Sequence, residues 1–370
     1  MRINKQQALQ LYQEGLLPEL AERADKTTRK LRPDNVRTYV VERNINYTNA
    51  CCCRCSFCAF SASPGGENGF VLDFDKIAEK IEELLSIGGT QILLQGGLNP
   101  ELSFSWYEEL LRRIKERFPR LHIHAFSPPE ICFMAERFGM TIPEVIEKLR
   151  SAGLATIPGG GAEILVDRVR KIISPAKCST QRWLDVMQQA HKLGMCTTAT
   201  MMFGHVETPA ERIEHLDRLR TLQDESLEQR AGNPSAGHFT AFTCWPFQPG
   251  STRLGRLDRY DPVGDKDRPR RDNELLLSGA FEQLKMTALA RIYLDNIPNI
   301  QASWVTQGPK IAQLSLLAGC NDIGSLMMEE NVVSAAGTTF RVQLEELRQL
   351  IRTAGFQPVQ RDYYYNLLLK

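Results

Sequence analysis

Short strand-like runs alternate with amphipathic helical segments along most of the chain. Such alternation is typical of repeated βα units around a parallel sheet. It predicts an α/β fold, a (β/α)8 TIM-type barrel that is full or near-full, with a six-stranded partial barrel as the alternative. The eight runs that predict strands are Thr38–Ile45, Thr90–Leu94, Leu121–Phe126, Leu154–Ile157, Thr197–Met202, Phe239–Thr243, Ile300–Trp304 and Asn321–Ser325. We expect an N-terminal helical extension over 1–35, the barrel over 36–336, and a C-terminal helix and tail packing on it over 337–370.

Two helices have ends that can be located from the sequence. Asp73 can cap a helix whose buried stripe is Ile77, Ile81, Leu84 and Leu85, and Gly88-Gly89 can end it. Thr208-Pro209-Ala210-Glu211 forms a capping box with proline at the first helical position. The residues before Thr208 are therefore a βα loop, which in a barrel lies on the face that carries active sites. Three tracts fall on such loops: 95–97, 158–163 and 204–207.

Charge and composition limit the expected partners. The 45 basic and 44 acidic side chains nearly cancel, so no global field favours nucleic acid or anionic lipid. No apolar run reaches the roughly 18 to 20 residues that a membrane span needs, and the polar N-terminus is unlike a secretory signal. We expect a cytoplasmic protein that binds a small molecule and neither nucleic acid nor membrane.

Five of the ten cysteines lie between Cys51 and Cys58, which favours a metal site over disulfides. Cys51, Cys55 and Cys58 have C-x3-C-x2-C spacing on one loop after the first predicted strand. Iron–sulfur clusters are held by thiolates, and three thiolates leave one iron of a [4Fe-4S] cluster open to another ligand. Zinc is the main alternative, but no second cysteine pair follows. Cys52 or Cys53 could complete a closed site.

This loop, with the aromatic Phe57 before Cys58, resembles the signature of the radical S-adenosylmethionine (SAM) superfamily. The resemblance implies that SAM binds the open iron and is cleaved to a 5'-deoxyadenosyl radical, which takes hydrogen from the substrate. It also implies a SAM site at Phe57 and at Gln95-Gly96-Gly97, where leucine at Leu98 replaces the acidic residue of the family motif. Further SAM contacts would come from Glu163 with the ribose, and from Arg168 or Arg170 with the carboxylate.

Much of the region from Tyr39 to Ala336 is similar to the cyclic dehypoxanthinyl futalosine synthase family of menaquinone biosynthesis. The strings that carry this likeness include residues 43–49, 122–130, 157–165, 198–208, 245–250 and 328–333. Cysteine at Cys52 and Cys53 departs from the expected pattern. The resemblance implies that dehypoxanthine futalosine loses hydrogen from the ribose C4', closes onto its benzoate ring and is oxidised to a spirocyclic product. A reductant such as flavodoxin or ferredoxin would supply electrons.

That reaction needs a proton acceptor and donors for the substrate. His205 or Glu207 is the first candidate acceptor and His124 the second, because imidazole and carboxylate accept protons near neutral pH. Candidate substrate-binding residues near strand ends are Asn46, Thr48, His124, Ser303, Gln307 and Asn321, with Trp245 and Phe247 placed to stack on the ring. The alternatives are aminofutalosine synthase, a deazaflavin synthase-like enzyme, and a closed-cluster or zinc-binding module without SAM cleavage.

Overall fold

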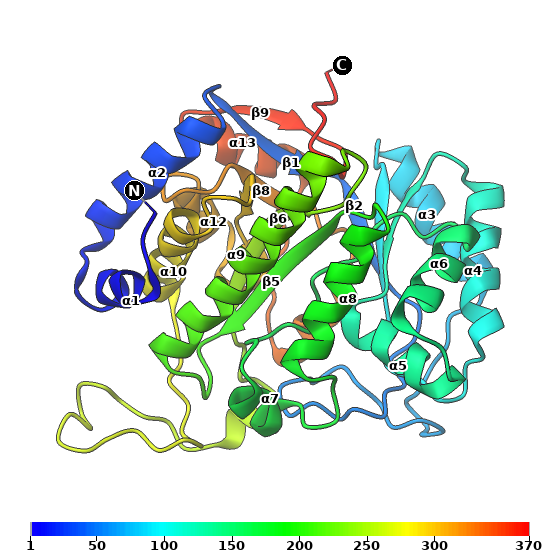
Figure 1. Cartoon of the computed structure of the whole chain (residues 1–370), viewed down its shortest axis with the longest axis horizontal. Helices are drawn as coiled ribbons and strands as arrows, with labels where there is room; N and C mark the ends of the chain where they lie inside the picture. The colour runs from blue at the N-terminus through cyan, green and yellow to red at the C-terminus, as the bar shows by residue number, and fades with distance from the viewer. Residues whose placement is uncertain (1, 370) are drawn as a thin grey trace.

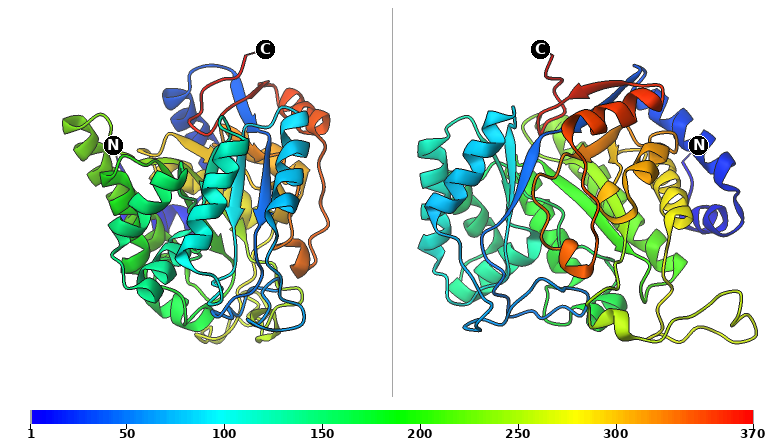
Figure 2. Two further views of the ribbon diagram at one scale, coloured as in Figure 1. Left: turned by 90° about the vertical axis from the view of Figure 1, so that its right-hand side faces the viewer. Right: turned by 180° about the vertical axis from the view of Figure 1, so that it is seen from behind.

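The computed structural model describes residues 2–369 and has the architecture of a TIM-type α/β barrel, as the pattern predicted (Figures 1 and 2). Every ladder between strands is parallel. The strands are β1 (Val36–Val40), β2 (Glu42–Asn46), β3 (Gln91–Gln95), β4 (His122–Ala125), β5 (Thr197–Phe203), β6 (Phe239–Pro246), β7 (Asn299–Gln301), β8 (Asp322–Ser325) and β9 (Gln357–Gln360).

The strands follow one another around the barrel, but the hydrogen-bonded ladder is not continuous. One sheet has the order β5-β6-β7-β8-β1-β9, and the other has the order β2-β3-β4. Val41 joins β1 to β2 covalently, and on the far side the single bridges His124↔Thr156 and Ile157↔Thr197 connect β4 to β5. The hydrogen-bonded ladder is therefore interrupted between β1 and β2 and between β4 and β5, while the strands still surround one interior.

Helices cover the outside of the strands (Figure 1). Helices α3–α6 lie on one side, α8 and α9 on the next, and α10 and α12 beyond them, while α1 packs against α9 and α2 against α10. No helix within residues 2–369 combines the length and apolar character needed to cross a membrane. The helices are α1 (Lys5–Glu14), α2 (Leu17–Leu31), α3 (Phe74–Ser86), α4 (Phe104–Arg117), α5 (Pro128–Phe138), α6 (Ile142–Ala152), α7 (Asp167–Ile173), α8 (Thr180–Lys192), α9 (Pro209–Gly232), α10 (Ala280–Tyr293), α11 (Trp304–Gln307), α12 (Pro309–Ser315) and α13 (Leu344–Thr353), with short 3-10 turns at Leu254–Arg256 and Ser334–Ala336.

Both helix ends predicted from the sequence are confirmed. The Asp73 side chain accepts a hydrogen bond from the backbone N–H of Lys76, and Gly88 has a left-handed φ of 82° after the end of α3. Thr208 and Glu211 form the predicted capping box of α9. Leu85 was wrongly assigned to the buried stripe of α3, because it is 41% exposed. The hydrophobic stripe of this helix is therefore one residue narrower than predicted.

Three strand predictions differ from the structure. The run Thr38–Ile45 is divided at Val41, since β1 pairs with β8 and β9 whereas β2 pairs with β3. The run Leu154–Ile157 forms only the two isolated bridges, because Pro158 and three glycines follow it and turn the chain away. The seventh run ends at Gln301 in β7, and Trp304 begins α11. The strand β9 was not predicted.

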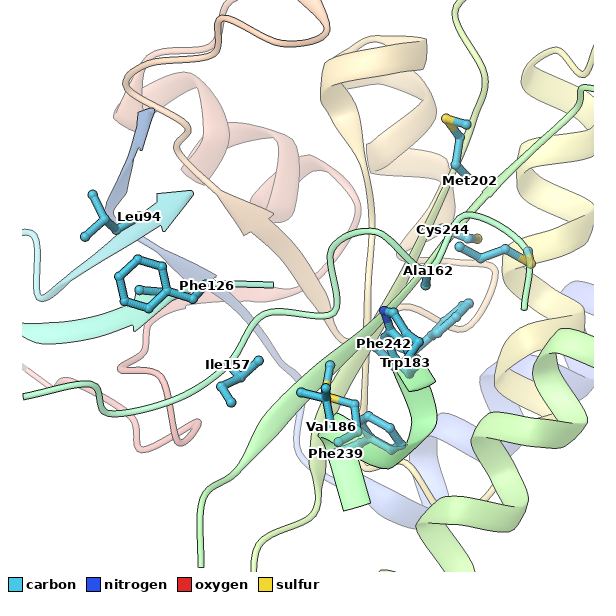
Figure 3. Packing of buried hydrophobic residues seen from close by; sticks show 14 of the residues in the cluster. Leu94, Phe126, Ile157, Ala162, Trp183, Val186, Met202, Phe239, Phe242 and Cys244 are labelled. Atoms are coloured by element: carbon cyan, nitrogen blue, oxygen red, sulfur yellow. The ribbon is translucent and has the colours of Figure 1, made fainter. Parts of the chain in front are cut away.

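Outward-facing strand residues and the surrounding helices form the main core. Figure 3 shows Phe239, Phe242 and Cys244 of β6 beside Trp183 and Val186 of α8. The labelled residues Leu94, Phe126, Ile157, Ala162 and Met202 belong to the same cluster. Burial of these apolar side chains, at about 25 cal/mol per Å² of area removed from water, fixes the helices on the strands. Because this core lies between the strands and the helices, the side chains inside the barrel can be polar without weakening it.

The C-terminal tail crosses the barrel end that carries the strand N-termini, opposite the loop of residues 47–73 (Figure 1). Arg361 leaves β9 and pairs with Asp322 of β8, at 2.5 Å between Nε and Oδ2, with both side chains buried. Thr38 of β1 donates a second hydrogen bond to the same carboxylate at 2.6 Å. Asp322 therefore ties two strands to the tail.

Replacing Arg361 with methionine should lower the free energy of unfolding by about 3–5 kcal/mol, because it leaves the buried Asp322 carboxylate without its cation. Urea titration followed by circular dichroism measures this loss. Arg352→Met removes an exposed ion pair with Glu345 and should leave the unfolding midpoint unchanged. Equal midpoints for both variants would show that the buried pair does not stabilise the fold.

Candidate active site

The loop that carries the cysteine cluster is fixed at both ends on the C-terminal face of the barrel. It follows β2, and the Asn49 side chain donates to the carbonyl of Asn68 and accepts from the N–H of Phe70, both at 2.9 Å. The N–H of Cys51 donates to the carbonyl of Ala62, and that of Cys52 donates to the carbonyl of Leu98. These contacts hold the cysteines over the β3 loop.

Cys51, Cys55 and Cys58 line one cavity of about 310 Å³, which we call the cluster chamber. All three are free thiols. Cys53 is buried beside them, where its thiol donates to the carbonyl of Ala176 at 3.3 Å, and Cys52 is exposed. No group of three His, Cys, Asp or Glu side chains within residues 2–369 is already gathered around a single metal position.

The donor set nevertheless fits an iron–sulfur cluster. Interaction with the neighbouring Cys53 thiol is the main cause that lowers the pKa of Cys51 and of Cys55, and the positive charge of Lys177 acts in the same direction. Thiolates are the form that binds iron. Three thiols of one loop that face one cavity, two of them biased toward the thiolate, suit a cluster bound at three corners.

The glycines after β3 allow the backbone to pass directly under this loop. A Cβ atom on Gly97 would lie 2.2 Å from the carbonyl oxygen of Ala50, and one on Gly96 would lie 2.4 Å from the ring of Tyr47. Glu130 accepts hydrogen bonds from the N–H of Gly96 at 3.1 Å and from the hydroxyl of Tyr47 at 2.7 Å. The turn therefore cannot carry side chains at these two positions without moving.

The glycine-rich tract 158–163 forms another wall of the cluster chamber. Arg170 is buried and donates to the carbonyls of Gly161 and Ala162, so it shapes this tract from behind. Glu163 has a φ of 41° and pairs with Lys177 at 2.9 Å, while its buried Oε2 atom has no hydrogen-bond partner and lies 3.6 Å from Arg170 Nη1. A ligand hydroxyl group could donate a hydrogen bond to this oxygen.

A second cavity, of about 300 Å³, lies inside the barrel and is called here the inner chamber. Strand residues at alternate positions line it, and these are largely polar: Glu42, Asn44, Gln91, Gln95, His124, Thr198, Thr200 and Gln301. Barrel interiors are usually packed with branched apolar side chains, so a polar interior indicates a ligand site. Gln95, Gly160, Thr200, Trp245 and Thr306 line both chambers, which therefore adjoin.

The structure brings most of the predicted site residues to these chambers. Phe57, Gln95, Gly96, Gly97 and Glu163 line the cluster chamber with the cysteines, as do Asn46, Trp245 and Phe247. His124 and Ser303 line the inner chamber. Their individual roles stay predictions, but their common location is a property of the fold.

Two of the predicted catalytic residues lie outside both chambers. His205 and Glu207 have no exposed surface. Glu207 accepts from the N–H groups of Gly204 and His205 and pairs with Arg212 at 2.7 Å, while His205 Nδ1 accepts from the N–H of Val206. These contacts form the turn before α9, so neither side chain reaches a substrate in this conformation.

Four further predicted residues are engaged elsewhere, and a fifth lines neither chamber. Arg168 pairs with Glu211 at 2.6 Å, and Arg170 holds backbone carbonyls. The Thr48 hydroxyl donates to the carbonyl of Phe70, and Asn321 bonds to Asn299 and to the N–H of Ile300. Gln307 ends α11 and lines neither chamber. Of the six residues chosen for their place near strand ends, three line a chamber (Asn46, His124 and Ser303) and three do not (Thr48, Gln307 and Asn321).

Sequence reasoning missed several lining residues, namely Glu42, Asn44, Gln91, Lys177, Glu330, Arg361, Tyr363 and Tyr365. A signal for the strand residues was present. Parallel strands covered on both faces normally read as continuous apolar runs. On the face that points into the barrel, β2 instead carries Glu42, Asn44 and Asn46, and β3 carries Gln91 and Gln95. The tail residues gave no such signal.

The cluster loop, the adjoining glycine turns and the barrel together define a radical SAM enzyme. Residues 45–219 match the family model of the Radical SAM superfamily, and residues 236–369 match that of the CofH/MqnC C-terminal region. The chain belongs to the radical SAM superfamily, whose members use a [4Fe-4S] cluster and SAM.

Within this superfamily, the chain is 43% identical to a cyclic dehypoxanthine futalosine synthase of Halalkalibacterium halodurans, over 99% of the chain and 92% of the relative. It is 41% identical to the synthase of that name in Streptomyces coelicolor, over 100% of the chain and 86% of the relative. It is also 40% identical to a 5-amino-6-(D-ribitylamino)uracil–L-tyrosine 4-hydroxyphenyl transferase of Methanococcoides burtonii, over 94% and 91%.

Solved structures support the fold. The crystal structure of methylornithine synthase (PylB) matches with a TM-score of 0.67 at 19% identity, over 97% of this chain and 94% of that one. The FeFe-hydrogenase maturase HydG from Carboxydothermus hydrogenoformans matches with a TM-score of 0.69 at 16% identity, over 98% of this chain and 77% of that one. The barrel thus has the architecture of these enzymes.

Proposed function

We propose that this protein is a radical SAM cyclase that converts dehypoxanthine futalosine to cyclic dehypoxanthine futalosine in menaquinone biosynthesis. The observation that carries the proposal is the pair of adjoining chambers, one lined by the three cysteines and the other by polar strand residues. Two curated relatives of this name, similar over nearly the whole chain, support it. A soluble reductant such as flavodoxin or ferredoxin would supply the electrons.

Cys51, Cys55 and Cys58 would hold the cluster, and Phe57, Gly96, Gly97 and Glu163 would contact SAM. When bound and reduced, the cluster and SAM would supply a 5'-deoxyadenosyl radical able to take a hydrogen atom from the ribose C4'. After ring closure, the substrate radical would give one proton to the chain and one electron to the oxidised electron carrier. The chain itself must keep that carbon close to the shared wall of the two chambers, because a positioned reactive group needs its target aligned. Trp245 and Thr200 of this wall would orient the substrate.

His124 is the residue we propose as proton acceptor once the sugar carbon has closed onto the benzoate ring. Its Nδ1 atom lies 2.8 Å from the Thr156 hydroxyl, and it faces the inner chamber. Burial is the main cause that holds the pKa of His124 well below its usual range, so the ring is uncharged at neutral pH and has a ring nitrogen free for the proton, although the same burial weakens it as a base. The rate of product formation is therefore expected to show no transition near pH 6.5 from titration of this histidine.

The direct test is anaerobic turnover with SAM, a chemical reductant and dehypoxanthine futalosine. The expected product is lighter than the substrate by the two hydrogens that cyclisation removes. Consumption of substrate must accompany formation of 5'-deoxyadenosine. The transferase relatives, at comparable identity, favour a second candidate, transfer between L-tyrosine and 5-amino-6-(D-ribitylamino)uracil. Product from that pair alone would exclude the cyclase.

Replacing His124 with glutamine should lower cyclised product by about 100-fold or more, the usual contribution of a general base. Formation of 5'-deoxyadenosine should persist, because hydrogen abstraction precedes proton loss. The matched control is His238→Gln, since His238 is a half-buried histidine that lines neither chamber and does not contact Thr156. Equal losses in the two variants, or an unchanged product ratio in His124→Gln, would remove His124 from the reaction.

A further inference from the structure

The inner chamber is built in layers that follow the strand register. Glu42 pairs with Gln91, which pairs with His122, and these residues begin their strands. Asn44, Leu93 and His124 form the next layer, and Asn46 pairs with Gln95 above it. Asn46 lies four residue steps above Glu42 along β2, a height of roughly 13 Å at about 3.3 Å per step. Gln95 belongs to the wall shared with the cluster chamber.

The lower part of this chamber has hydrogen-bond acceptors without donors. Gln91 donates its side-chain N–H to Glu42, which leaves Gln91 Oε1 buried and unpartnered. Asn44 Oδ1 is buried and unpartnered as well. Buried polar atoms are normally paired because an unpaired one retains its desolvation cost. These two amide oxygens and the Glu42 carboxylate therefore form the floor of the inner chamber, where they can accept hydrogen bonds from a ligand.

The same floor is unsuited to an anion. Arg361 is the cation that lines the inner chamber, and Asp322 accepts from two of its nitrogens, at 2.5 and 3.2 Å. Burial raises the pKa of Glu42, whereas Gln91 and Arg361 favour its charged form. A carboxylate placed here would meet acceptors and a neutralised guanidinium. Neutral hydroxyl groups would instead donate to each acceptor.

We propose that Glu42, Asn44 and Gln91 bind the ribose hydroxyls of the substrate, so that it enters the barrel sugar first. This inference rests on the proposed function and adds the orientation of the substrate to it. The sugar ring then lies at the level of Asn44 and His124, one layer below the shared wall, and its C4' carbon, which bears the chain to the benzoate, faces upward toward Gln95 and Trp245. The benzoate carboxylate lies away from the floor.

The test measures binding of three compounds to the reconstituted holoenzyme without reductant: dehypoxanthine futalosine, an analogue lacking ribose hydroxyls, and an analogue lacking the benzoate carboxylate. In Glu42→Gln and Asn44→Leu, the dissociation constant of the substrate should rise about 10-fold, the usual effect of losing one well-placed hydrogen bond to a charged or buried group. The deoxy analogue should bind these variants and the wild type almost equally. Removal of the benzoate carboxylate should raise the dissociation constant by the same factor in the variants as in the wild type.

Controls separate this proposal from the proposed function. Glu83→Gln makes the same chemical change on the outer surface, where Glu83 binds Arg43, and should bind all three compounds as the wild type does. Iron content and thermal melting show whether each variant is folded. If Glu42→Gln fails to fold, Asn44→Leu still tests the proposal, because it removes no hydrogen bond within the protein. Absence of wild-type turnover would reject the cyclase itself. The sugar-first orientation would be overturned if the wild type turns over but the variants change the effect of removing the benzoate carboxylate. It would also be overturned if the variants change the effect of neither the carboxylate nor the ribose hydroxyls.

Discussion

Replacing Cys55 with serine should leave the protein without its cluster and reduce 5'-deoxyadenosine formation to background. The buried Cys55 thiol lines the cluster chamber, and a serine hydroxyl cannot replace a thiolate as an iron ligand. After anaerobic reconstitution, iron should fall from about four atoms per chain, the cubane stoichiometry, to a small fraction of that value. Iron analysis and the absorbance of the cluster measure the change.

The matched control is Cys52→Ser in the same loop. Cys52 is exposed and lines neither chamber, so this variant should keep its full iron content and its activity. The pair of variants also decides whether Cys52 takes part in binding iron. Full iron in Cys55→Ser, or an equal loss in Cys52→Ser, would contradict the assignment of the three ligands.

The second large effect is expected from Gly97→Ala. The new methyl group would lie 2.2 Å from the carbonyl oxygen of Ala50 and 2.8 Å from Cys51 Cβ, so the cluster loop or the β3 turn must move. We expect at least half of the iron to be lost and unfolding to become easier by about 1–3 kcal/mol, as for other overpacked sites. Iron content and urea denaturation report the two effects separately.

Gly232→Ala provides the comparison for this substitution. Gly232 ends α9, and a Cβ atom there would meet nothing within 4 Å. Alanine at this position should leave iron binding unchanged and stabilise the protein slightly, by up to about 1 kcal/mol, because it restricts the unfolded chain. A Gly97→Ala protein that binds iron normally would show that the loop can move without cost.

Much of the fold could be predicted because local signals determine it. The caps at Asp73 and Thr208 and the alternation of strands and helices depend on neighbouring residues, and the structure has them as expected. The strand β9 could not be predicted, because the string Gln357–Gln360 has little β-propensity and is held by pairing with the distant β1. Tertiary contacts thus override local preference at the C-terminal end.

The candidate site divides in the same way. The three cysteines could be assigned because their spacing on one loop is itself the chemical signal. His205 and Glu207 had the right chemistry and the right loop, but the sequence does not reveal that the Glu207 carboxylate is used by Arg212 and by two backbone N–H groups. Arg361 and Tyr363 reach the chamber from the far end of the chain, and only the folded structure shows this.

The Thr156 hydroxyl has a single proton to share between two imidazole rings, at His122 Nε2 and His124 Nδ1. If His124 accepts a proton at Nε2, its Nδ1 must carry hydrogen and donate to Thr156, which then donates to His122. The tautomer of His124 is thus selected by a neighbouring ring on the same strand. A protonated His122 would reverse this selection, but burial lowers the pKa of His122 to about 4, so the productive arrangement persists at neutral pH.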